Sequence, residues 1–396
     1  MRVLYIPSGD DKYGAPKSMM ELVGNLSERH NIEPIIMTCK KGLINEWSDK
    51  HGFENYVLGQ GSFMVVGGSN WFRKTVKHGM YPYLKYKYEM EDMYARQRIE
   101  KLIGNKRIDL IHTNVNRVDI GGYYSLGHEV PHVWHLREFG KEDYNCMFLR
   151  RDAVDFMNKS STMFVAISNA VKQAWIDKGL EEKKIKVIYN GIDLSNYPKE
   201  IPERVNTQLG PLKIVFAGII SETKGQYQLI KAIDALPDHI KKQVKVDFYG
   251  GGREEYINKL QNIVKRLKLE SLITFKGYSS RLFEILPQYD IGIVASRAEA
   301  FGRVTIEYMA SGLCVIASNS GANPEIVHDA ENGLLYKFND YQELADKIRY
   351  LAANRDVLFR IRKYAYESVS SRYSMNRCAD DVYDLYREIA RTADLK

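Results

Sequence analysis

The chain has 396 residues, of which 44% are hydrophobic and 27% are charged. This length is too great for one ordinary hydrophobic core and predicts two domains of about 150–200 residues each, in a globular, water-soluble protein. Lysine and arginine exceed aspartate and glutamate by 57 to 50, which favours anionic partners such as phosphates or a lipid surface. The charge is spread along the chain without a recognition motif, so nucleic acid is excluded as a partner.

Two further features bear on the compartment. No apolar run approaches the roughly 18 residues that span a bilayer, and Met1-Arg2 leads directly into the strand-like VLYI without a signal-peptide pattern. The cysteines lie far apart and form no CxxC pair or metal-spaced cluster. We therefore expect a cytoplasmic protein with reduced cysteines. They are Cys39, Cys146, Cys314 and Cys378.

The first half of the chain alternates short apolar runs with helical periodicity. Val3–Ile6 predicts a strand, and a helix begins at Ala15-Pro16, where proline is tolerated in the first turn. This alternation predicts a parallel sheet covered by helices on both faces. Further strands are expected at Pro34–Thr38, Asp109–His112, His132–Leu136, Met163–Ile167 and Val187–Asn190, with helices at Glu89–Ile103 and Ala170–Lys178.

The pattern pauses after Asp193 in a proline-containing polar stretch, read as a linker over residues 196–211. It then restarts. Strands are expected at Lys213–Ala217, Val244–Tyr249, Leu272–Lys276, Asp290–Val294 and Leu313–Ala317. Helices are expected at Gln226–Leu236, Glu254–Leu267, Val304–Ser311, Tyr341–Ala353, Asp356–Ser370 and Met375–Ala390.

The predicted fold class is therefore α/β, with two doubly wound Rossmann-like domains. We expect an N-terminal domain over residues 1–195, rejoined by a C-terminal helix at 375–396, and a second domain over 212–374. Ligands of such sheets bind beyond the carboxyl ends of the strands, which predicts an active site in a cleft between the two domains.

Four small-residue turns lie directly between a strand and a helix. Such turns let backbone N–H groups at a helix N-terminus approach an anion, although glycine also serves ordinary turn geometry. None of them fits G-x-G-x-x-G or the Walker A pattern, which disfavours a nicotinamide dehydrogenase or a P-loop ATPase. Their positions at matching ends of two sheets predict a phosphate-bearing ligand. The turns are Tyr13–Ala15, Gly218–Gly225, Gly250–Gly252 and Phe301–Arg303.

Two carboxylates, Glu299 and Glu307, flank the last of these turns. Both are ordinary solvated residues in the simpler interpretation, because glutamate is mostly exposed. With a helix beginning near Gly302 or Arg303, however, Glu307 leans back toward the amides of residues 302–304. Carboxylates suit hydroxyl groups on either side of a phosphate, so the group fits a ribose and a hexose joined by a diphosphate.

Lys224 and His135 are further candidates, each with a simpler alternative. Lys224 precedes Gly225 at a strand–helix turn, where a long cation can meet a diphosphate; alone, lysine is usually solvated. His135 ends a strand of the first domain and precedes Arg137. It can hydrogen-bond a sugar hydroxyl, or it is a satisfied core or edge histidine.

The segment from Trp71 to Tyr88 contains five lysines or arginines, six aromatic residues and no acidic residue. This composition suits an interfacial segment whose cations meet anionic lipid and whose rings lie at headgroup level. The alternative is a solvated basic loop with some rings packed on the domain.

These motifs together resemble the family 4 retaining glycosyltransferases of the GT-B fold, over nearly the whole chain. The matching segments are Gly14–Ser18, Ile111–Asn114, Trp134–Asp143, Asn190–Asp193, the E-x7-E element Glu299–Glu307, the turn Gly321–Glu325 and Glu331–Tyr336. Two of the segments, Ile111–Asn114 and Trp134–Asp143, further resemble the bacterial capsule and surface-polysaccharide branch.

The resemblance implies a nucleotide-sugar donor, UDP- or GDP-linked, on the C-terminal domain and a glycan or lipid-linked acceptor on the N-terminal one. By analogy Glu307 bonds the ribose, Glu299 the donor sugar and Lys224 the diphosphate, while His135 contacts the sugar. No D-x-D occurs in the chain, consistent with a metal-independent reaction without a cofactor. The other implied donor-binding residues are Gly14, Ala15, Gly218, Gly250, Phe301, Gly302, Arg303 and Val304.

One position departs from the family pattern. The family often has an arginine after the glycine of the first C-domain strand, and this chain has Ile219 there. Either Arg303 or another cation replaces it, or donor binding is weaker. The main hypothesis is a retaining hexosyltransferase, attached peripherally to the inner membrane face, that extends a polysaccharide precursor. Two alternatives remain: a non-catalytic nucleotide-sugar-binding partner of a transferase, and a nucleotide-sugar epimerase.

Overall fold

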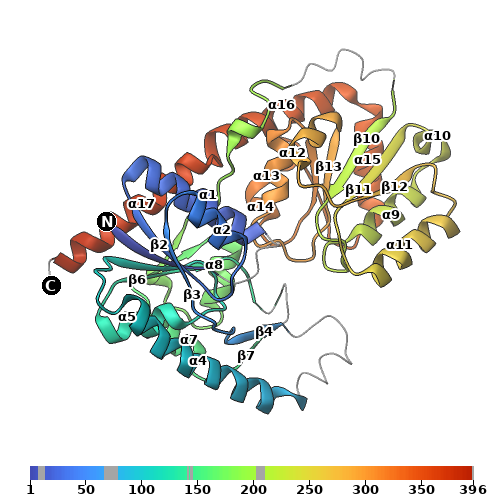
Figure 1. Cartoon of the computed structure of the whole chain (residues 1–396). Coiled ribbons are helices and arrows are strands. Elements are labelled where there is room, and N and C mark those ends of the chain that lie inside the picture. Colours follow the sequence, from blue (N-terminus) through green and yellow to red (C-terminus); the bar gives the residue numbers. More distant parts are fainter. Residues whose placement is uncertain (8–13, 67–78, 141, 143–145, 202–209, 395–396) are drawn as a thin grey trace. The chain divides into compact units, whose positions relative to one another are not determined.

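The computed structural model describes residues 1–7, 14–66, 79–140, 142, 146–201 and 210–394. They form two compact units, which are drawn in Figure 1. Unit 1 comprises Met1–Gly191 and Met375–Lys396, and unit 2 comprises Ile192–Ser374. The residues expected as a linker therefore group with unit 2, except for 202–209, which lie outside the described residues.

Among the described residues, seven strands of unit 1 form a parallel sheet in the order β3-β2-β1-β5-β6-β8-β9. The central strands are buried along their whole length, which explains their near-continuous apolar sequences. The strands are β1 (Arg2–Ile6), β2 (Glu33–Thr38), β3 (Glu54–Val57), β5 (Leu110–Thr113), β6 (His132–Leu136), β8 (Met163–Ala166) and β9 (Ile185–Val187). An antiparallel pair, β4 (Met64–Val66) and β7 (Cys146–Phe148), lies apart from this sheet.

Helices cover both faces of this sheet (Figure 1). On one face α1, α2 and α17 share a core with alternate residues of the strands, and on the other α4 and α5 do so. The C-terminal helix packs along α1 through residues spaced three or four apart, the spacing of one helix face. The helices are α1 (Gly14–His30), α2 (Leu43–Lys50), α4 (Tyr81–Ile103), α5 (Ile120–His128), α7 (Ala153–Ser160), α8 (Asn169–Ile176) and α17 (Met375–Asp394).

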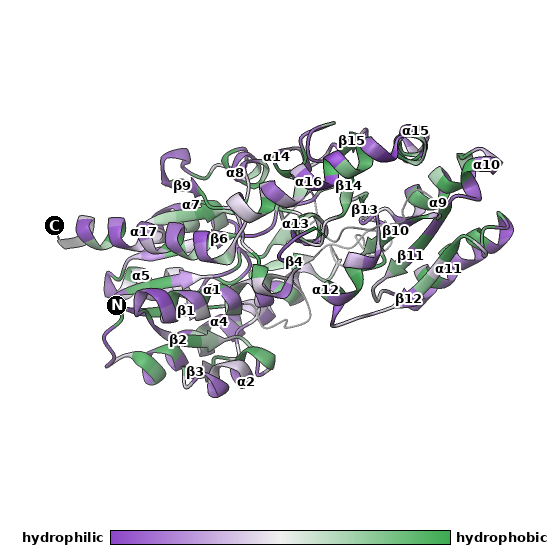
Figure 2. Cartoon of the chain, turned by 90° about the horizontal axis from the view of Figure 1, so that it is seen from above, coloured by the Kyte–Doolittle hydropathy of each residue, from purple (hydrophilic) through white to green (hydrophobic). Residues whose placement is uncertain are grey.

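Unit 2 contains a second parallel sheet, of six described strands in the order β12-β11-β10-β13-β14-β15. Figure 2 shows hydrophobic strands and amphipathic helices such as α11, as expected for a sheet buried on both faces. The strands are β10 (Leu212–Ala217), β11 (Val244–Tyr249), β12 (Ile273–Gly277), β13 (Ile291–Val294), β14 (Cys314–Ser318) and β15 (Leu334–Tyr336). The helices are α9 (Gln226–Ala235), α10 (Asp238–Lys241), α11 (Glu254–Arg266), α12 (Leu282–Ile285), α13 (Arg303–Ala310), α14 (Asn323–Ile326), α15 (Tyr341–Ala353) and α16 (Arg355–Arg372).

The predicted α/β class with two doubly wound Rossmann-like domains is confirmed. Two predicted boundaries are wrong. The strand expected at Val187–Asn190 is β9, which ends at Val187 because Asn190 instead bonds Arg137. The helix expected from Glu89 begins at Tyr81, with proline in its first turn.

No helix in the described part of the chain is long and apolar enough to cross a membrane. The same residues contain no group of three or more histidine, cysteine, aspartate or glutamate side chains arranged to hold a metal ion. All four cysteines are free thiols.

Candidate functional site

The candidate site in unit 2 is organised by the loop between β13 and α13. Gly302 is the N-cap of α13 and has φ +91°, a left-handed conformation that favours glycine. The loop places Glu299 before the helix and Glu307 in its second turn. The sequence therefore predicted correctly where this helix begins.

Glu299 is bonded to Lys224, which comes from the loop after β10. Lys224 Nζ and Ser296 Oγ both donate to Glu299 Oε2, each at 2.8 Å. The carboxylate side chain is 13% exposed and that of Lys224 is 35% exposed. Neither residue is the solvated surface residue of the simpler interpretation, and the two loops bring together residues 75 positions apart.

The environment of Glu299 stabilises its charged form. Burial alone raises the pKa of this carboxyl, but the charge and hydrogen bond of Lys224 outweigh burial, with help from Ser296 and the Gly302 N–H. The net effect lowers the pKa of Glu299 below its usual value. Glu299 is therefore a permanent anion at neutral pH.

The second carboxylate, Glu307, is held by Arg303 one turn earlier on α13. Arg303 Nε donates to Glu307 Oε1 at 3.0 Å, and both side chains are less than one fifth exposed. Arg303 was the sequence-based candidate to replace the arginine missing at Ile219. In this structure it neutralises Glu307, while Ile219 is 43% exposed.

Two residues that the sequence analysis did not identify shape the loop that carries Lys224. Gln226 is fully buried; its Nε2 donates to the Ile219 carbonyl at 3.0 Å and its Oε1 accepts from the Ser221 N–H at 3.2 Å. The Arg297 N–H donates to the Thr223 carbonyl at 2.9 Å, which ties this loop to the one bearing Glu299. No sequence signal distinguished Gln226 from a helix surface residue.

The turn after β14 supports the backbone of Glu299. The Ala322 N–H donates to the Glu299 carbonyl at 2.7 Å, and Ser318 and Ser320 hydroxyls donate to the Ser296 carbonyl at 2.8 and 2.7 Å. Ser296 itself was missed, although a polar residue directly after an apolar strand is a usable signal. The loops after β13 and β14, which follow one another in the sequence, are thus in direct contact.

Gly218 and Gly250 bring two loops into contact at the ends of β10 and β11. A Cβ on Gly250 would lie 1.8 Å from the Gly218 carbonyl oxygen, so only glycine fits. The N–H groups of these glycines donate to Tyr249 and Gly277 carbonyls, at 2.9 and 2.8 Å. The two predicted donor-binding glycines therefore use their amides within the protein, and what they provide is close packing.

Helix α13 is fixed to the sheet by Tyr308, which follows Glu307. Its hydroxyl accepts a hydrogen bond from the Ala217 N–H at 2.6 Å, and its ring lies against Gly292, where a Cβ would be 2.3 Å from the ring. Phe301 is also buried, with its ring centroid 6.0 Å from that of Tyr373. The phenylalanine side chain is thus a packing group, and Val304 follows in the first turn of α13.

The remaining candidates lie in unit 1. Gly14 is exposed and begins α1, and Ala15 follows it; Tyr13 of the same predicted turn lies outside the described residues. His135 is fully buried at the end of β6. Its burial agrees with the core-histidine alternative, but its Nε2 has no hydrogen-bond partner among the described residues.

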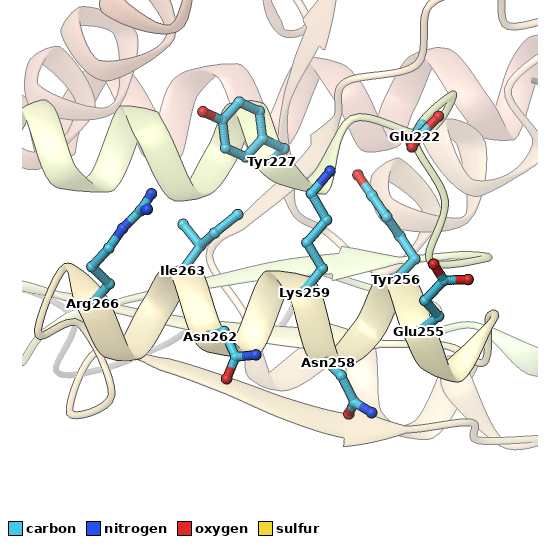
Figure 3. Close-up of a pocket in the computed structure, with 9 residues that line it drawn as sticks. All are labelled: Glu222, Tyr227, Glu255, Tyr256, Asn258, Lys259, Asn262, Ile263 and Arg266. Carbon is cyan, nitrogen blue, oxygen red and sulfur yellow. The ribbon is translucent and has the colours of Figure 1, made fainter. Parts of the chain in front are cut away.

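A separate groove of about 1050 Å³ lies between α9 and α11 in unit 2. In Figure 3 Tyr227 projects from α9, and Tyr256, Lys259 and Arg266 project toward it from α11. None of the sequence-predicted site residues lines this groove. One of its lining residues, Glu222, belongs to the same loop as Lys224.

The fold is the two-domain GT-B fold of glycosyltransferases. Family models confirm the class in two adjoining segments: "Glycosyltransferase Family 4" matches residues 14–196, and "Glycosyl transferases group 1" matches residues 199–368. The chain belongs to this family of glycosyltransferases.

Curated relatives share part of their length with this chain. Spore coat protein SA of Bacillus subtilis is 28% identical over 52% of this chain and 59% of that protein. The capsular polysaccharide biosynthesis glycosyltransferase CapH of Staphylococcus aureus is 25% identical over 57% of this chain and 64% of its own. The chain thus spans less than two thirds of either relative.

Solved structures match over nearly the whole chain. Anabaena HepE in complex with UDP aligns with a TM-score of 0.78, covering 98% of this chain and 100% of HepE, at 22% identity. This similarity establishes the shared fold.

Proposed function

We propose that this glycosyltransferase transfers a hexose-type sugar from a UDP- or GDP-sugar to a polysaccharide precursor or a lipid-linked acceptor, with retention of anomeric configuration. The observation that carries the proposal is the pair of carboxylate–cation contacts, Lys224–Glu299 and Arg303–Glu307, on either side of the start of α13. A ligand with both hydroxyls and phosphates can provide a new hydrogen-bond partner for each of these four side chains. Its hydroxyls donate to the carboxylates, and its phosphate oxygens accept from the cations.

The roles follow from these contacts and from the family resemblance. Glu299 accepts from hydroxyls of the donor sugar, and Glu307 from the ribose. Lys224 binds the diphosphate, which also lies near the N-terminus of α13, where the helix dipole favours negative charge. Arg303 and Arg297 are the candidates for the second phosphate cation; Arg297 is exposed on the same loop and has no ion-pair partner among the described residues.

In the proposed reaction, the bond between the sugar C1 and the diphosphate oxygen breaks and the acceptor oxygen bonds to C1 on the same face. The proton of the acceptor hydroxyl passes to the departing phosphate oxygen, so no enzyme nucleophile is required. Lys224 and the N-terminus of α13 stabilise the negative charge that develops on the leaving diphosphate. We propose that they do this without a metal ion.

The comparisons support the substrate class. HepE was solved with UDP and with UDP-glucose, and CapH is described as a capsular polysaccharide biosynthesis enzyme. By analogy with these proteins, we favour a UDP-sugar over a GDP-sugar as the donor of this chain, and a polysaccharide precursor over a lipid-linked molecule as its acceptor.

The test is transfer from candidate donors by Glu299→Gln and Lys224→Ala. Each variant is expected to lose at least about 100-fold in kcat/KM, since each removes charge-assisted contacts to the donor. The matched control is Lys231→Ala, which removes a lysine paired with Asp234 at 3.3 Å on the neighbouring helix α9. Near wild-type transfer by both site variants would refute the residue roles. The anomeric configuration of the product, read by NMR, tests retention.

The choice of nucleotide is tested by thermal unfolding with UDP, GDP and their sugars. A ligand that binds only the folded protein at 100 times its Kd adds about 2.7 kcal/mol of stability and raises the Tm. We expect UDP to raise it and the Lys224→Ala variant to respond less. Interconversion of donor sugars without acceptor would instead indicate an epimerase.

The exposed Ile219 favours one second candidate, a nucleotide-sugar-binding partner that lacks catalysis. Such a protein shows the UDP-dependent rise in Tm but releases no sugar. Slow hydrolysis of the donor by the purified protein, lost in Glu299→Ala, would exclude this candidate.

We also propose that unit 1 docks on an anionic membrane at the cytoplasmic face. Residues 71–78 of the basic aromatic segment lie outside the described residues, and the rest begins α4. Tyr88 is buried there and bonds Asp119, but the N-cap residue and the outer face of α4 expose a stripe of methionine and tyrosine side chains. The stripe is Met80, Tyr83, Tyr86, Met93 and Tyr94, each 44–62% exposed.

Tyrosines on such a stripe suit the headgroup region, where an apolar ring and a polar hydroxyl are both accommodated. Lys85 and Lys87 pair with Glu89 and Glu91 at 3.6 Å, so the attraction to anionic lipid rests mainly on the basic residues before α4. Co-flotation with phosphatidylglycerol vesicles tests this. Combined Tyr83, Tyr86 and Tyr94→Ser changes are expected to abolish it, whereas the control Tyr350 and Tyr364→Ser changes on α15 and α16 preserve it; equal flotation would refute the proposal.

A further inference from the structure

A chain of four buried polar side chains crosses the core of unit 1. Tyr5 on β1 and His112 on β5 occupy paired positions of adjacent strands, and His135 lies on the next strand, β6. Tyr386 reaches them from the C-terminal helix α17. All four side chains are at most 1% exposed, so their polar atoms depend on partners within the protein and not on bulk water.

The contacts within this chain are short. The Tyr386 hydroxyl lies 2.5 Å from His112 Nδ1, and His112 Nε2 lies 3.1 Å from His135 Nδ1. The Tyr386 hydroxyl is also oriented to donate to that of Tyr5, at the longer distance of 3.4 Å. Each hydrogen bond to a histidine ring nitrogen contains one hydrogen. Whether the ring donates or accepts this hydrogen decides which of its nitrogens is protonated.

Both histidines are neutral. Burial lowers the pKa of His112 to about 3, with further contributions from the charge of Arg137 and from His132. Burial, Arg137 and His112 lower the pKa of His135 well below its usual range. A neutral imidazole has one N–H, so a single proton must lie between the two rings.

Arg137 fixes the position of that proton. Its guanidinium donates to the Asn114 carbonyl and side chain at 3.1 and 2.9 Å and to Asn190 Oδ1 at 2.8 Å, which holds its orientation. Its remaining terminal nitrogen then lies 3.4 Å from His135 Nδ1. A guanidinium has only donors, so this Nδ1 is an acceptor without hydrogen.

The rest of the chain follows. His112 Nε2 carries hydrogen and donates to His135 Nδ1, and His112 Nδ1 therefore accepts from the Tyr386 hydroxyl. The single hydrogen of that hydroxyl goes to the 2.5 Å contact with His112 and not to the 3.4 Å contact with Tyr5. The reverse direction would point an N–H of His135 at the positive Arg137. The 2.5 Å contact also suits a phenol donating to an imidazole nitrogen, since a phenol is the better donor of the two.

We propose that Tyr386 and Arg137 are positioning residues that hold His135, through His112, in the tautomer with hydrogen on Nε2. The role of His135 that follows rests on the proposed transferase function. In this tautomer His135 acts toward its substrate as a hydrogen-bond donor to a sugar or phosphate oxygen and not as a general base. Its Nε2 is buried and has no partner among the described residues, so a substrate oxygen would complete the chain.

The same strand supplies an internal reference of opposite tautomer. His132 Nδ1 lies 3.0 Å from the Ser160 carbonyl, an acceptor, and Nε2 lies 2.8 Å from the Thr113 hydroxyl. His132 therefore carries its hydrogen on Nδ1. One spectrum of one sample contains both tautomers.

The experiment is 15N NMR of the histidine rings in the full-length protein, which distinguishes protonated from unprotonated ring nitrogens. Signals are assigned with single His→Gln variants. We expect hydrogen on Nε2 of His112 and His135 and on Nδ1 of His132. Hydrogen on Nδ1 of His135 would overturn the proposal, whether or not the protein transfers sugar.

Two matched variants test the role of Tyr386. Tyr386→Phe removes the donor to His112, and Tyr5→Phe removes a buried hydroxyl from the same cluster but leaves that donor in place. We expect the Nδ1-protonated form of His135 to rise at least about tenfold in Tyr386→Phe over Tyr5→Phe, with kcat/KM for transfer falling in proportion to the fraction of the Nε2-protonated form that is lost. Equal tautomer populations in the two variants would refute the assigned role of Tyr386. Correct tautomers without any transfer would refute the proposed function and leave the tautomer assignment intact.

Discussion

At the residue scale, the central feature of the site is a carboxylate kept ionised by its partners. Glu299 and Lys224 come from different loops, and this partly buried ion pair is costly to break because the more buried carboxylate would lose its partner. Within this pair the charge of Glu299 is neutralised by that of Lys224. A donor that replaces both partners at once avoids leaving either charge unpaired.

The lowered pKa of Glu299 predicts a dependence of stability on acid. The folded-state pKa lies below the ordinary value of 4.5, so the unfolded chain binds a proton first. The stabilisation is fully present above pH 4.5 and is lost as the pH falls through the folded-state pKa. Denaturant unfolding between pH 3 and 6 should show a smaller loss of unfolding free energy in Glu299→Gln than in wild type. Parallel curves would contradict this origin.

Ile219 offers a gain-of-affinity prediction. It is exposed beside the Gly218 turn, where the family resemblance implies an arginine. Ile219→Arg should add a charge-assisted contact and tighten UDP binding about tenfold, or ~1.4 kcal/mol. Calorimetry measures this, with Ile219→Gln as the uncharged control. An unchanged Kd would mean that Arg303 or Arg297 already occupies the position.

At the element scale, the site depends on how α13 rests on the sheet. Gly292 on β13 leaves room for the Tyr308 ring, and the Tyr308 hydroxyl accepts from the end of β10. Both carboxylates lie on the segment held in this way. Packing far from the ligand therefore sets the positions of Glu299 and Glu307.

Gly292→Ala should disturb this arrangement. The new Cβ would lie 2.3 Å from the Tyr308 ring, and such overpacking costs about 1–3 kcal/mol. We expect a lower unfolding free energy and weaker UDP binding together. The control is Gly127→Ala on α5, where no atom lies within 4 Å of the added Cβ. A lower unfolding free energy with an unchanged Kd for UDP would show that the position of α13 does not control UDP binding.

The sequence predicted long periodic elements well and short ones poorly. Helix α5 was missed because Gly121 and Gly122 resemble a turn; a Cβ on them would lie 2.3 Å from Thr113 Oγ1 and 2.5 Å from Ser160 Oγ. Strand β3, ENYV, has no apolar run because none of its residues is fully buried. In both cases tertiary contacts override the local signal.

The site residues likewise divide into those that the local sequence pattern predicts and those that depend on tertiary contacts. Strand ends and the Gly302 turn follow from local pattern, so the positions of Glu299, Glu307 and Lys224 were predictable. The pairing of Lys224 with Glu299 was not, because it depends on two loops meeting. The contact of His112 with Tyr386 joins residues 274 positions apart, and no periodicity links them.

At the scale of the whole molecule, the two units differ in their buried titratable groups. Unit 1 contains three fully buried histidines, His112, His132 and His135, beside the buried carboxylate Asp119, whereas Glu299, the carboxylate of lowered pKa in the candidate site, belongs to unit 2. Burial lowers the pKa of His132 to about 4, despite its hydrogen bond to the Ser160 carbonyl. The units should therefore respond to different ranges of acid.

Unit 1 is expected to unfold first as the pH falls. Its buried histidines stay neutral while those of the unfolded chain protonate near pH 6.5, so the unfolded state binds more protons and stability falls below pH 6.5. Each histidine contributes up to about 1.4 kcal/mol per pH unit. Three of them can offset a typical stability of about 5–15 kcal/mol within a few pH units, before Glu299 titrates.

Tryptophan fluorescence isolates this transition, because all four tryptophans, Trp47, Trp71, Trp134 and Trp175, belong to unit 1. Acid titration should change the fluorescence between about pH 6 and 4, with a further loss of helical circular dichroism from unit 2 at lower pH. Saturating UDP, if it binds unit 2, should shift the second transition and leave the fluorescence midpoint in place. Coincident fluorescence and dichroism transitions below pH 4 would show that the buried histidines do not limit the stability of unit 1.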